Sequence, residues 1–153
     1  AIAYERLENE REALNCYEMA LSIKPDYYSA LNNKGLIYYN RKEFKKAIEL
    51  FDGAISANQS YAKAYYNKGL ALDSLEFTGQ ALDAFTKAVQ YDENYIFAWY
   101  EKAVCEDRLH KIGNALLSFE KFLDLAEKSQ EARYSEYIEH ARHRLVQIKK
   151  DAK

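Results

Sequence analysis

Residues 62–95 read AKAYYNKGLALDSLEFTGQALDAFTKAVQYDENY, and they align without a gap on residues 28–61, which read YSALNNKGLIYYNRKEFKKAIELFDGAISANQSY. The same interval of about 34 residues recurs on both sides of these stretches. One set of columns holds Ala13, Ala47, Ala81 and Ala115; Tyr17, Phe51, Phe85 and Phe119; Leu14, Ile48, Leu82 and Leu116; and Ala20, Ala54, Ala88 and Phe122. A second set holds Leu31, Tyr65 and Trp99, then Gly35, Gly69 and Ala103. The pattern predicts one structural unit that recurs along most of the chain.

Each unit has the apolar spacing of two helices. A small residue at a fixed place on each helix lets two backbones approach, and the aromatic residue one turn later fills the space between them. Asp26, Ser60 and Asn94 share one phase before the first helix of each unit, where their side-chain oxygens suit an N-cap. We therefore expect helices close to residues 11–23, 27–40, 44–57, 61–74, 78–91, 95–108 and 112–126.

This pattern resembles the tetratricopeptide repeat family. The resemblance rests on an aromatic residue or Leu, then Gly or Ala, then Tyr4 or Tyr38 in the first helix of a unit, on Ala, aromatic and Ala in the second helix, and on Pro25 at the end of the first unit. The departures from the family pattern are Glu106, Phe122, Gln59 and Glu93. The resemblance implies an all-α fold, a right-handed solenoid of antiparallel helix pairs.

We expect the repeat array to cover residues 1–129, as a partial repeat at 1–27 and full repeats at 28–61, 62–95 and 96–129. The phase then changes, and helical spacing resumes with Tyr137, Ile138, Ala141, Leu145 and Ile148. This predicts a C-terminal capping segment over 130–153, with its helix at 132–150, because an open array needs a polar lid. The chain has no initiator Met and enters the pattern partway, so we expect a fragment of a longer polypeptide.

The composition excludes several classes of protein. The chain has 22 Lys and Arg against 24 Asp and Glu, which argues against a strongly basic nucleic-acid binder. No stretch of about 18 apolar residues suggests a membrane span. Cys16 and Cys105 lie far apart and have no metal-binding spacing, so we expect two free thiols and a cytoplasmic location.

No residue pattern points to catalysis or to a cofactor. His140 and His143 could place two metal donors on one helical turn, but a solvated surface pair is the favoured interpretation because structural metal sites are usually four-coordinate. No Gly-rich phosphate loop or activated nucleophile is recognisable. The basic residues near the C-terminus are diluted by acidic ones, and the aromatic residues are mostly committed to packing. We therefore predict no enzyme activity, no cofactor, no metal, and neither nucleic acid nor membrane as a partner.

The resemblance implies that the first helix of each unit lines a concave face that binds peptides. On this basis the candidate residues are Ser29, Asn32, Asn33, Leu36, Tyr39, Asn40, Lys63, Tyr66, Asn67, Leu70, Asp73, Phe97, Tyr100, Glu101, Val104 and Arg108. Asn side chains offer a donor and an acceptor to an extended backbone, and Tyr supplies contact area at low entropic cost. The alternative is that the apolar column, above all Leu36 and Leu70, simply packs neighbouring helices together.

Chaperone-binding members of the family hold a terminal carboxylate with a clamp of Lys and Asn residues and an Arg. In one register Asn33 and Lys63 match the clamp, but Ile2 and Asn67 stand where Asn and Arg are required. In the next register Asn67 matches, and the mismatches are Asn32, Leu36, Phe97 and Glu101. We therefore predict no carboxylate clamp, and we keep a peptide contact centred on Lys63.

The leading hypothesis is a protein–protein interaction scaffold that binds a peptide or helix of a partner on the concave face. The alternative is a structural module that self-associates into a homo-oligomer through its open amino-terminal repeat, where Tyr4, Leu7, Tyr17 and Leu21 lack a full covering helix.

Overall fold

The computed structural model describes residues 2–151, with the side chains described for residues 9–150. Its helices are α1 (Ile2–Ile23), α2 (Tyr28–Asn40), α3 (Phe44–Ala57), α4 (Ala62–Ser74), α5 (Thr78–Tyr91), α6 (Ile96–Arg108), α7 (Ile112–Ser129) and α8 (Ser135–Asp151), with a short 3₁₀ helix η1 (Ala132–Tyr134) before α8. No strand occurs over this range. The all-α prediction is confirmed.

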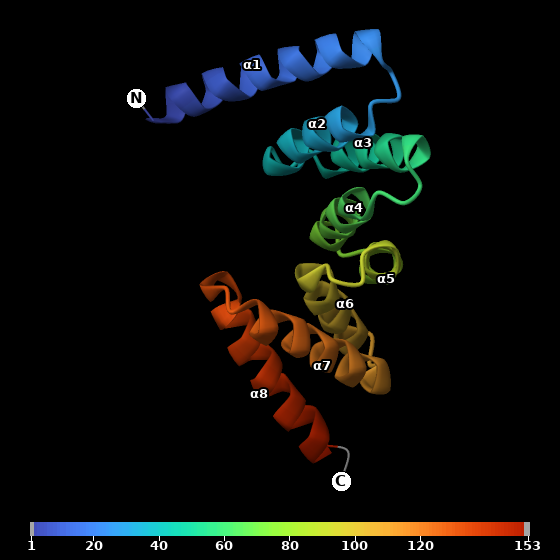
Figure 1. Cartoon of the computed structure of the whole chain (residues 1–153), viewed down its shortest axis with the longest axis vertical. Helices are drawn as coiled ribbons and strands as arrows, with labels where there is room; N and C mark the ends of the chain where they lie inside the picture. The colour runs from blue at the N-terminus through green and yellow to red at the C-terminus, as the bar shows by residue number, and fades with distance from the viewer. Residues whose placement is uncertain (1, 152–153) are drawn as a thin grey trace.

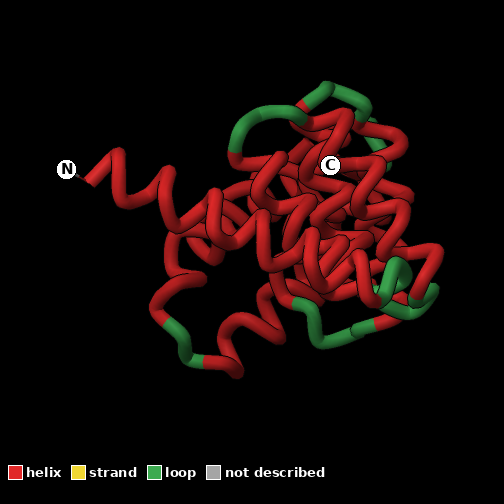
Figure 2. The backbone as a smooth tube through the Cα atoms, turned by 90° about the horizontal axis from the view of Figure 1, so that it is seen from above, coloured by secondary structure: helices red, strands yellow, loops and turns green. Residues whose placement is uncertain are grey.

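The helices form antiparallel pairs that stack along the long axis of the molecule as a right-handed superhelix (Figure 1). Helices α2, α4 and α6 are the first members of the pairs, termed here the A helices, and α3, α5 and α7 are the B helices. Each pair buries its apolar stripe against its own partner and against the next pair, which is why a repeated sequence gives a continuous core. The view from above shows short connecting loops and the N-terminal part of α1 projecting from the stack (Figure 2).

Small residues set the distance between the two helices of a pair. A Cβ atom added to Gly35 would lie 2.6 Å from the Phe51 ring, and one added to Gly69 would lie 2.5 Å from the Phe85 ring. Both rings are fully buried. The predicted arrangement, in which an aromatic ring fills the space above a small residue, is therefore present in the first two full units.

The predicted helix caps are wrong. Tyrosines occupy the N-cap positions of the A helices, at Tyr27, Tyr61 and Tyr95, and none makes a side-chain cap hydrogen bond. The polar residues shape the preceding loop instead. The backbone N–H of Ser60 donates to Asn58 Oδ1 and that of Asn94 donates to Asp92 Oδ1, both at 3.1 Å. These turns fix the direction in which the chain enters each A helix.

The turn from each A helix into its B helix contains a residue in the left-handed region. Lys42, Glu76 and His110, spaced like the repeat, have φ of 62°, 64° and 55°. Glycine favours this conformation, and none of the three positions carries one. The turn was therefore not recognisable from Gly in the sequence.

The ends of the array differ from the prediction in extent. Helix α1 begins at Ile2 and runs without a turn to Ile23, whereas a helix starting near residue 11 was expected. Residues 2–14 contain no Gly or Pro that would interrupt the helix. Helix α7 runs to Ser129, about one turn beyond the predicted end, and this extra turn accounts for the shifted phase of the fully buried Ala141 in α8.

Candidate peptide-binding face

The sixteen candidate residues all lie on the A helices, and together they are termed the A-helix face. Helix α2 carries Ser29, Asn32, Asn33, Leu36, Tyr39 and Asn40; α4 carries Lys63, Tyr66, Asn67, Leu70 and Asp73; α6 carries Phe97, Tyr100, Glu101, Val104 and Arg108. Equivalent positions on successive A helices come together because each unit repeats the same packing.

Polar pairs join neighbouring A helices and remove part of this face from solvent. Asn67 Nδ2 donates to Asn32 Oδ1 at 2.8 Å, and the two residues are 8% and 2% exposed. Asn32 Nδ2 in turn donates to Asn33 Oδ1 at 3.3 Å. The amide groups that were expected to face a peptide are therefore partly used in hydrogen bonds with one another. Asn33 is the most exposed of the three residues.

Tyr66 also packs largely within the fold. Its ring centroid lies 5.8 Å from that of Phe85 and 4.8 Å from that of Tyr95. Burial raises the pKa of the Tyr66 hydroxyl well above its usual value, and the nearby Glu101 carboxylate adds to this shift. The ring keeps only part of its surface available to a ligand.

Helix α8 covers the aromatic residues of the third unit. The Tyr137 ring lies 5.2 Å from Phe97 and 4.9 Å from Tyr100. The Tyr100 hydroxyl is 2.9 Å from His140 Nδ1, and Nε and Nη2 of Arg144 each donate to one carboxylate oxygen of Asp107. Phe97 and Tyr100, two of the candidate residues, therefore also serve as a docking surface for α8.

Several candidate residues remain accessible. Lys63 and Asn40 are exposed, and Leu36, Leu70 and Val104 pack against the core while keeping part of their surface in solvent. No ion pair or hydrogen bond to Lys63 occurs among the residues whose side chains are described. Both interpretations of the apolar column thus apply, since these residues pack and also border the solvent.

Glu101 is the one acidic residue in the column that carries Asn33 and Asn67. The pKa of the Glu101 carboxyl is raised to about 7, mainly by burial and to a lesser extent by the Asp73 carboxylate, while the Arg108 guanidinium opposes the shift. Arg108 is itself bound to Asp73 through Nη2. Burial likewise raises the pKa of the neighbouring Cys105 thiol to about 12, which keeps it protonated and unreactive at neutral pH.

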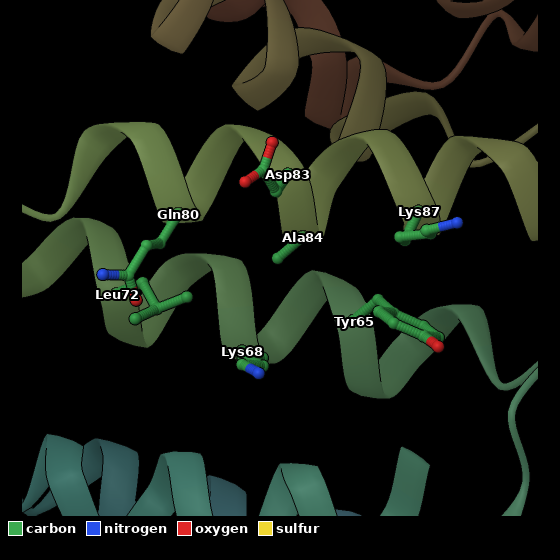
Figure 3. Close-up of a pocket in the computed structure, with 7 residues that line it drawn as sticks. All are labelled: Tyr65, Lys68, Leu72, Gln80, Asp83, Ala84 and Lys87. Atoms are coloured by element: carbon green, nitrogen blue, oxygen red, sulfur yellow. The ribbon is translucent and has the colours of Figure 1, made fainter. Parts of the chain in front are cut away.

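Sequence reasoning missed a second kind of site, which lies between the two helices of a pair. A pocket of about 280 Å³ lies between α4 and α5. Figure 3 shows the side chains that line it: Tyr65, Lys68, Leu72, Gln80, Asp83, Ala84 and Lys87. The third unit repeats it with residues that each lie one repeat further along, namely Trp99, Lys102, Asn114, Leu117, Ser118 and Lys121. The repeat interval applied to exposed columns would have revealed it.

The second of these pockets borders a buried polar network. Lys102 Nζ donates to Glu106 Oε1 at 2.6 Å and to Ser118 Oγ at 2.7 Å, and Ser118 Oγ donates to Glu106 Oε2 at 2.6 Å. Glu106, one of the departures from the family pattern, is 2% exposed. Each of the three side chains finds its hydrogen-bond partners within this network. The network is therefore a packing feature of the third unit.

Within the described residues, no group of three or more His, Cys, Asp or Glu side chains could hold a metal ion. None of the helices over residues 2–151 is both long enough and apolar enough to span a bilayer.

Comparison with known proteins agrees with this architecture. Two family models described as tetratricopeptide repeat match residues 1–63 and 62–95, which together are more than half of the chain. No curated protein matches the chain.

Solved structures show the same fold. MamA from Desulfovibrio magneticus RS-1 is 27% identical with a TM-score of 0.69, over 86% of this chain and 73% of that one. The first TPR of Spaghetti (RPAP3), bound to the HSP90 peptide SRMEEVD, is 19% identical with a TM-score of 0.69, over 82% and 92%. The TPR2B domain of yeast Sti1, in a complex with a pHsp70 ligand, is 18% identical with a TM-score of 0.72, over 78% and 96%.

Proposed function

The chain belongs to the tetratricopeptide repeat family, and from this premise we propose that it is a scaffold without catalytic activity that binds a segment of a partner protein on the A-helix face. The observation that carries the proposal is the accessible strip that remains after the helices have packed: exposed Lys63, with part of Leu36 and Leu70 in solvent. An apolar strip beside an unpaired cation suits a segment that offers both apolar and anionic groups.

Structural relatives support the proposal by analogy. The RPAP3 and Sti1 domains are solved with peptide or protein ligands, and this chain shares their fold. Only some positions of the carboxylate clamp are matched in this sequence, so the proposed partner segment is not required to end in a carboxylate held by that clamp. The reducing, cytoplasmic location expected from the sequence is part of the proposal, and Cys16 and Cys105 are both free thiols.

The experiment uses short random peptides displayed on phage and selected on the immobilised chain. Selected peptides are then titrated against the Lys63→Glu variant and against Lys87→Glu, a control on the B helix α5, where Lys87 is also exposed. We expect affinity to fall about tenfold or more for Lys63→Glu, because a charge at the contact is reversed, and to stay unchanged for Lys87→Glu. Equal affinity for both variants, or no selected peptide at all, would contradict binding at this face.

Self-association is the second candidate, and α1 is the observation that favours it. Met19 and Ile23 are 67% and 84% exposed. Tyr17 is only partly buried, whereas Phe51, its equivalent in the next unit, is fully buried. Leu21 is partly buried as well, while the side chains of Tyr4 and Leu7 lie outside the described residues. Light scattering over a range of concentrations tests this candidate, and a monomer at the highest concentration would end it.

A further inference from the structure

The third unit carries a carboxylate, Glu101, at a partly buried position where the first two units carry an amide. The equivalent column reads Asn33, Asn67 and then Glu101. In the first two units the amides bond to one another across the helices, through Asn32. The residue that takes the place of Asn32 beside Glu101 is Tyr66, and no hydrogen bond between the two is present among the described side chains.

The charges around Glu101 do not balance. Its carboxylate interacts electrostatically with Asp73 and Arg108, and the Arg108 guanidinium is already bound to Asp73. When Glu101 is ionised, this group of three side chains carries one negative charge. The cost of that charge appears in the pKa of Glu101, which burial raises to about 7.

The surroundings of Glu101 favour a cation over other ligands. Burial raises the pKa values of Tyr66 and Tyr100, and the Glu101 charge adds to both shifts. A cation beside Glu101 would supply an opposite charge, which favours the ionised carboxylate. An anionic ligand group would instead be repelled by both Glu101 and Asp73.

We propose that Glu101 receives a lysine or arginine side chain of the partner, so that the A-helix face selects segments with a basic residue at the position next to α6. This inference rests on the proposed function, since it assigns the partner's chemistry at the same face. The basic side chain would pair with Glu101 in the way that Arg108 pairs with Asp73. A charge-assisted hydrogen bond of this kind in a partly buried site is stronger than a neutral one. This requirement is opposite in sign to that of a carboxylate clamp.

The test selects short random phage-displayed peptides separately on the wild-type chain, on Glu101→Gln and on Glu101→Lys. Asp83→Asn serves as the matched control, because Asp83 is an exposed carboxylate on the B helix α5. Circular dichroism and thermal melting confirm that each variant is folded. We expect wild-type and Asp83→Asn selections to share a Lys or Arg at one position, and Glu101→Gln to lose that preference and to bind the wild-type peptides about tenfold more weakly.

The charge-reversed variant gives the sharpest outcome. Peptides selected on Glu101→Lys are expected to carry Asp or Glu where the wild-type peptides carry Lys or Arg. Wild-type peptides that depend on Lys63 but show no shared basic residue would overturn this inference and leave the proposed function standing. Peptides that bind independently of Lys63 would overturn both. If Glu101→Lys does not fold, the comparison between the wild-type chain and Glu101→Gln alone decides the question.

Discussion

Single residues fix the spacing of the helices in this protein. At Gly69 there is no room for a methyl group, because the Phe85 ring occupies the place where the Cβ atom would lie. At Gly79, in the first turn of α5, nothing lies within 4 Å of that place. The two glycines therefore have opposite roles, although both lie in helices.

We expect Gly69→Ala to lower the free energy of unfolding by about 1–3 kcal/mol, because the added methyl group forces the Phe85 ring to move. Gly79→Ala should raise it by about 0.5 kcal/mol, since alanine is the better helix former and meets no neighbour. Urea denaturation of both variants measures the difference. A Gly69→Ala variant that is as stable as Gly79→Ala would show that Phe85 does not require the glycine.

Glu101 gives a prediction about pH. Its folded pKa of about 7 lies above the ordinary 4.5, so the folded state holds the proton more tightly than the unfolded chain does. The stability that this group contributes is fully present below pH 4.5 and is lost as the pH rises through 7. The charged and titratable groups around it are Tyr66 and Asp73 from α4, and Tyr100, Cys105 and Arg108 from α6.

Glu101→Gln should therefore stabilise the fold at pH 8, on the order of 2 kcal/mol, and leave it nearly unchanged at pH 4. Thermal melting of the variant and the wild-type chain from pH 4 to pH 8 gives the difference in their stability at each pH. The titration of the other groups is common to both proteins and cancels in this difference. A constant difference between the two proteins at all pH values would show that Glu101 ionises normally. A variant that is more stable yet binds peptides less well would mark Glu101 as a residue kept for binding.

At the scale of elements, helix pairs that are equivalent in sequence are joined by different interactions. In the second unit Lys68 bonds to Asp52, a partly exposed pair at 2.6 Å between α4 and α3. In the third unit the equivalent Lys102 bonds to buried Glu106 within α6 and to Ser118 of α7. The first pair bridges two units, whereas the second lies within one.

Lys102→Ala should cost about 3–5 kcal/mol of unfolding free energy, because it leaves the buried Glu106 carboxylate without its cation. Lys68→Ala should cost no more than about 1 kcal/mol, because Asp52 remains in contact with water. Chemical denaturation of the two variants compares them directly. Similar costs at both positions would mean that burial of Glu106 is not what makes the third unit depend on its lysine.

The helices and their order were predictable because packing in a repeat constrains the same columns several times over. The ten predicted boundaries of the five helices between residues 27 and 108 lie within about a residue of the observed ones. The N-caps were not predictable, since Ser60 and Asn94 suit loop turns as well as caps. The contacts of Phe97 and Tyr100 with α8 were also missed, because α8 lies out of phase with the repeat.

At the scale of the whole molecule, stability in a stacked array depends on neighbours, and α1 has a neighbour on one side within the described chain. It is joined to α2 by ion pairs such as Lys34 with Glu18, and its Tyr17 and Ala20 are only partly buried. Helices α4 and α5 lie between two neighbouring pairs. Phe85 and Ala88 of α5, which occupy the repeat positions of Tyr17 and Ala20, are fully buried. Local opening should therefore begin at α1.

Hydrogen exchange measured by mass spectrometry tests this expectation. The amides of α1 should exchange earliest and those of α4 and α5 last, because the energy of local opening follows the buried contacts of each unit. If α1 were as protected as α5, a covering partner such as a second copy of the chain would have to be present. Repeating the measurement at low concentration separates these cases, since protection from a second copy is lost on dilution.

The site of binding on the whole molecule is tested most directly by the backbone amide chemical shifts of the ¹⁵N-labelled chain, recorded with and without a phage-selected peptide. We expect the largest shift changes in α2, α4 and α6, centred on Lys63, Leu70 and Glu101. Changes centred on α3, α5 and α7, such as around the pocket between Tyr65 and Lys87, would contradict binding at the A-helix face.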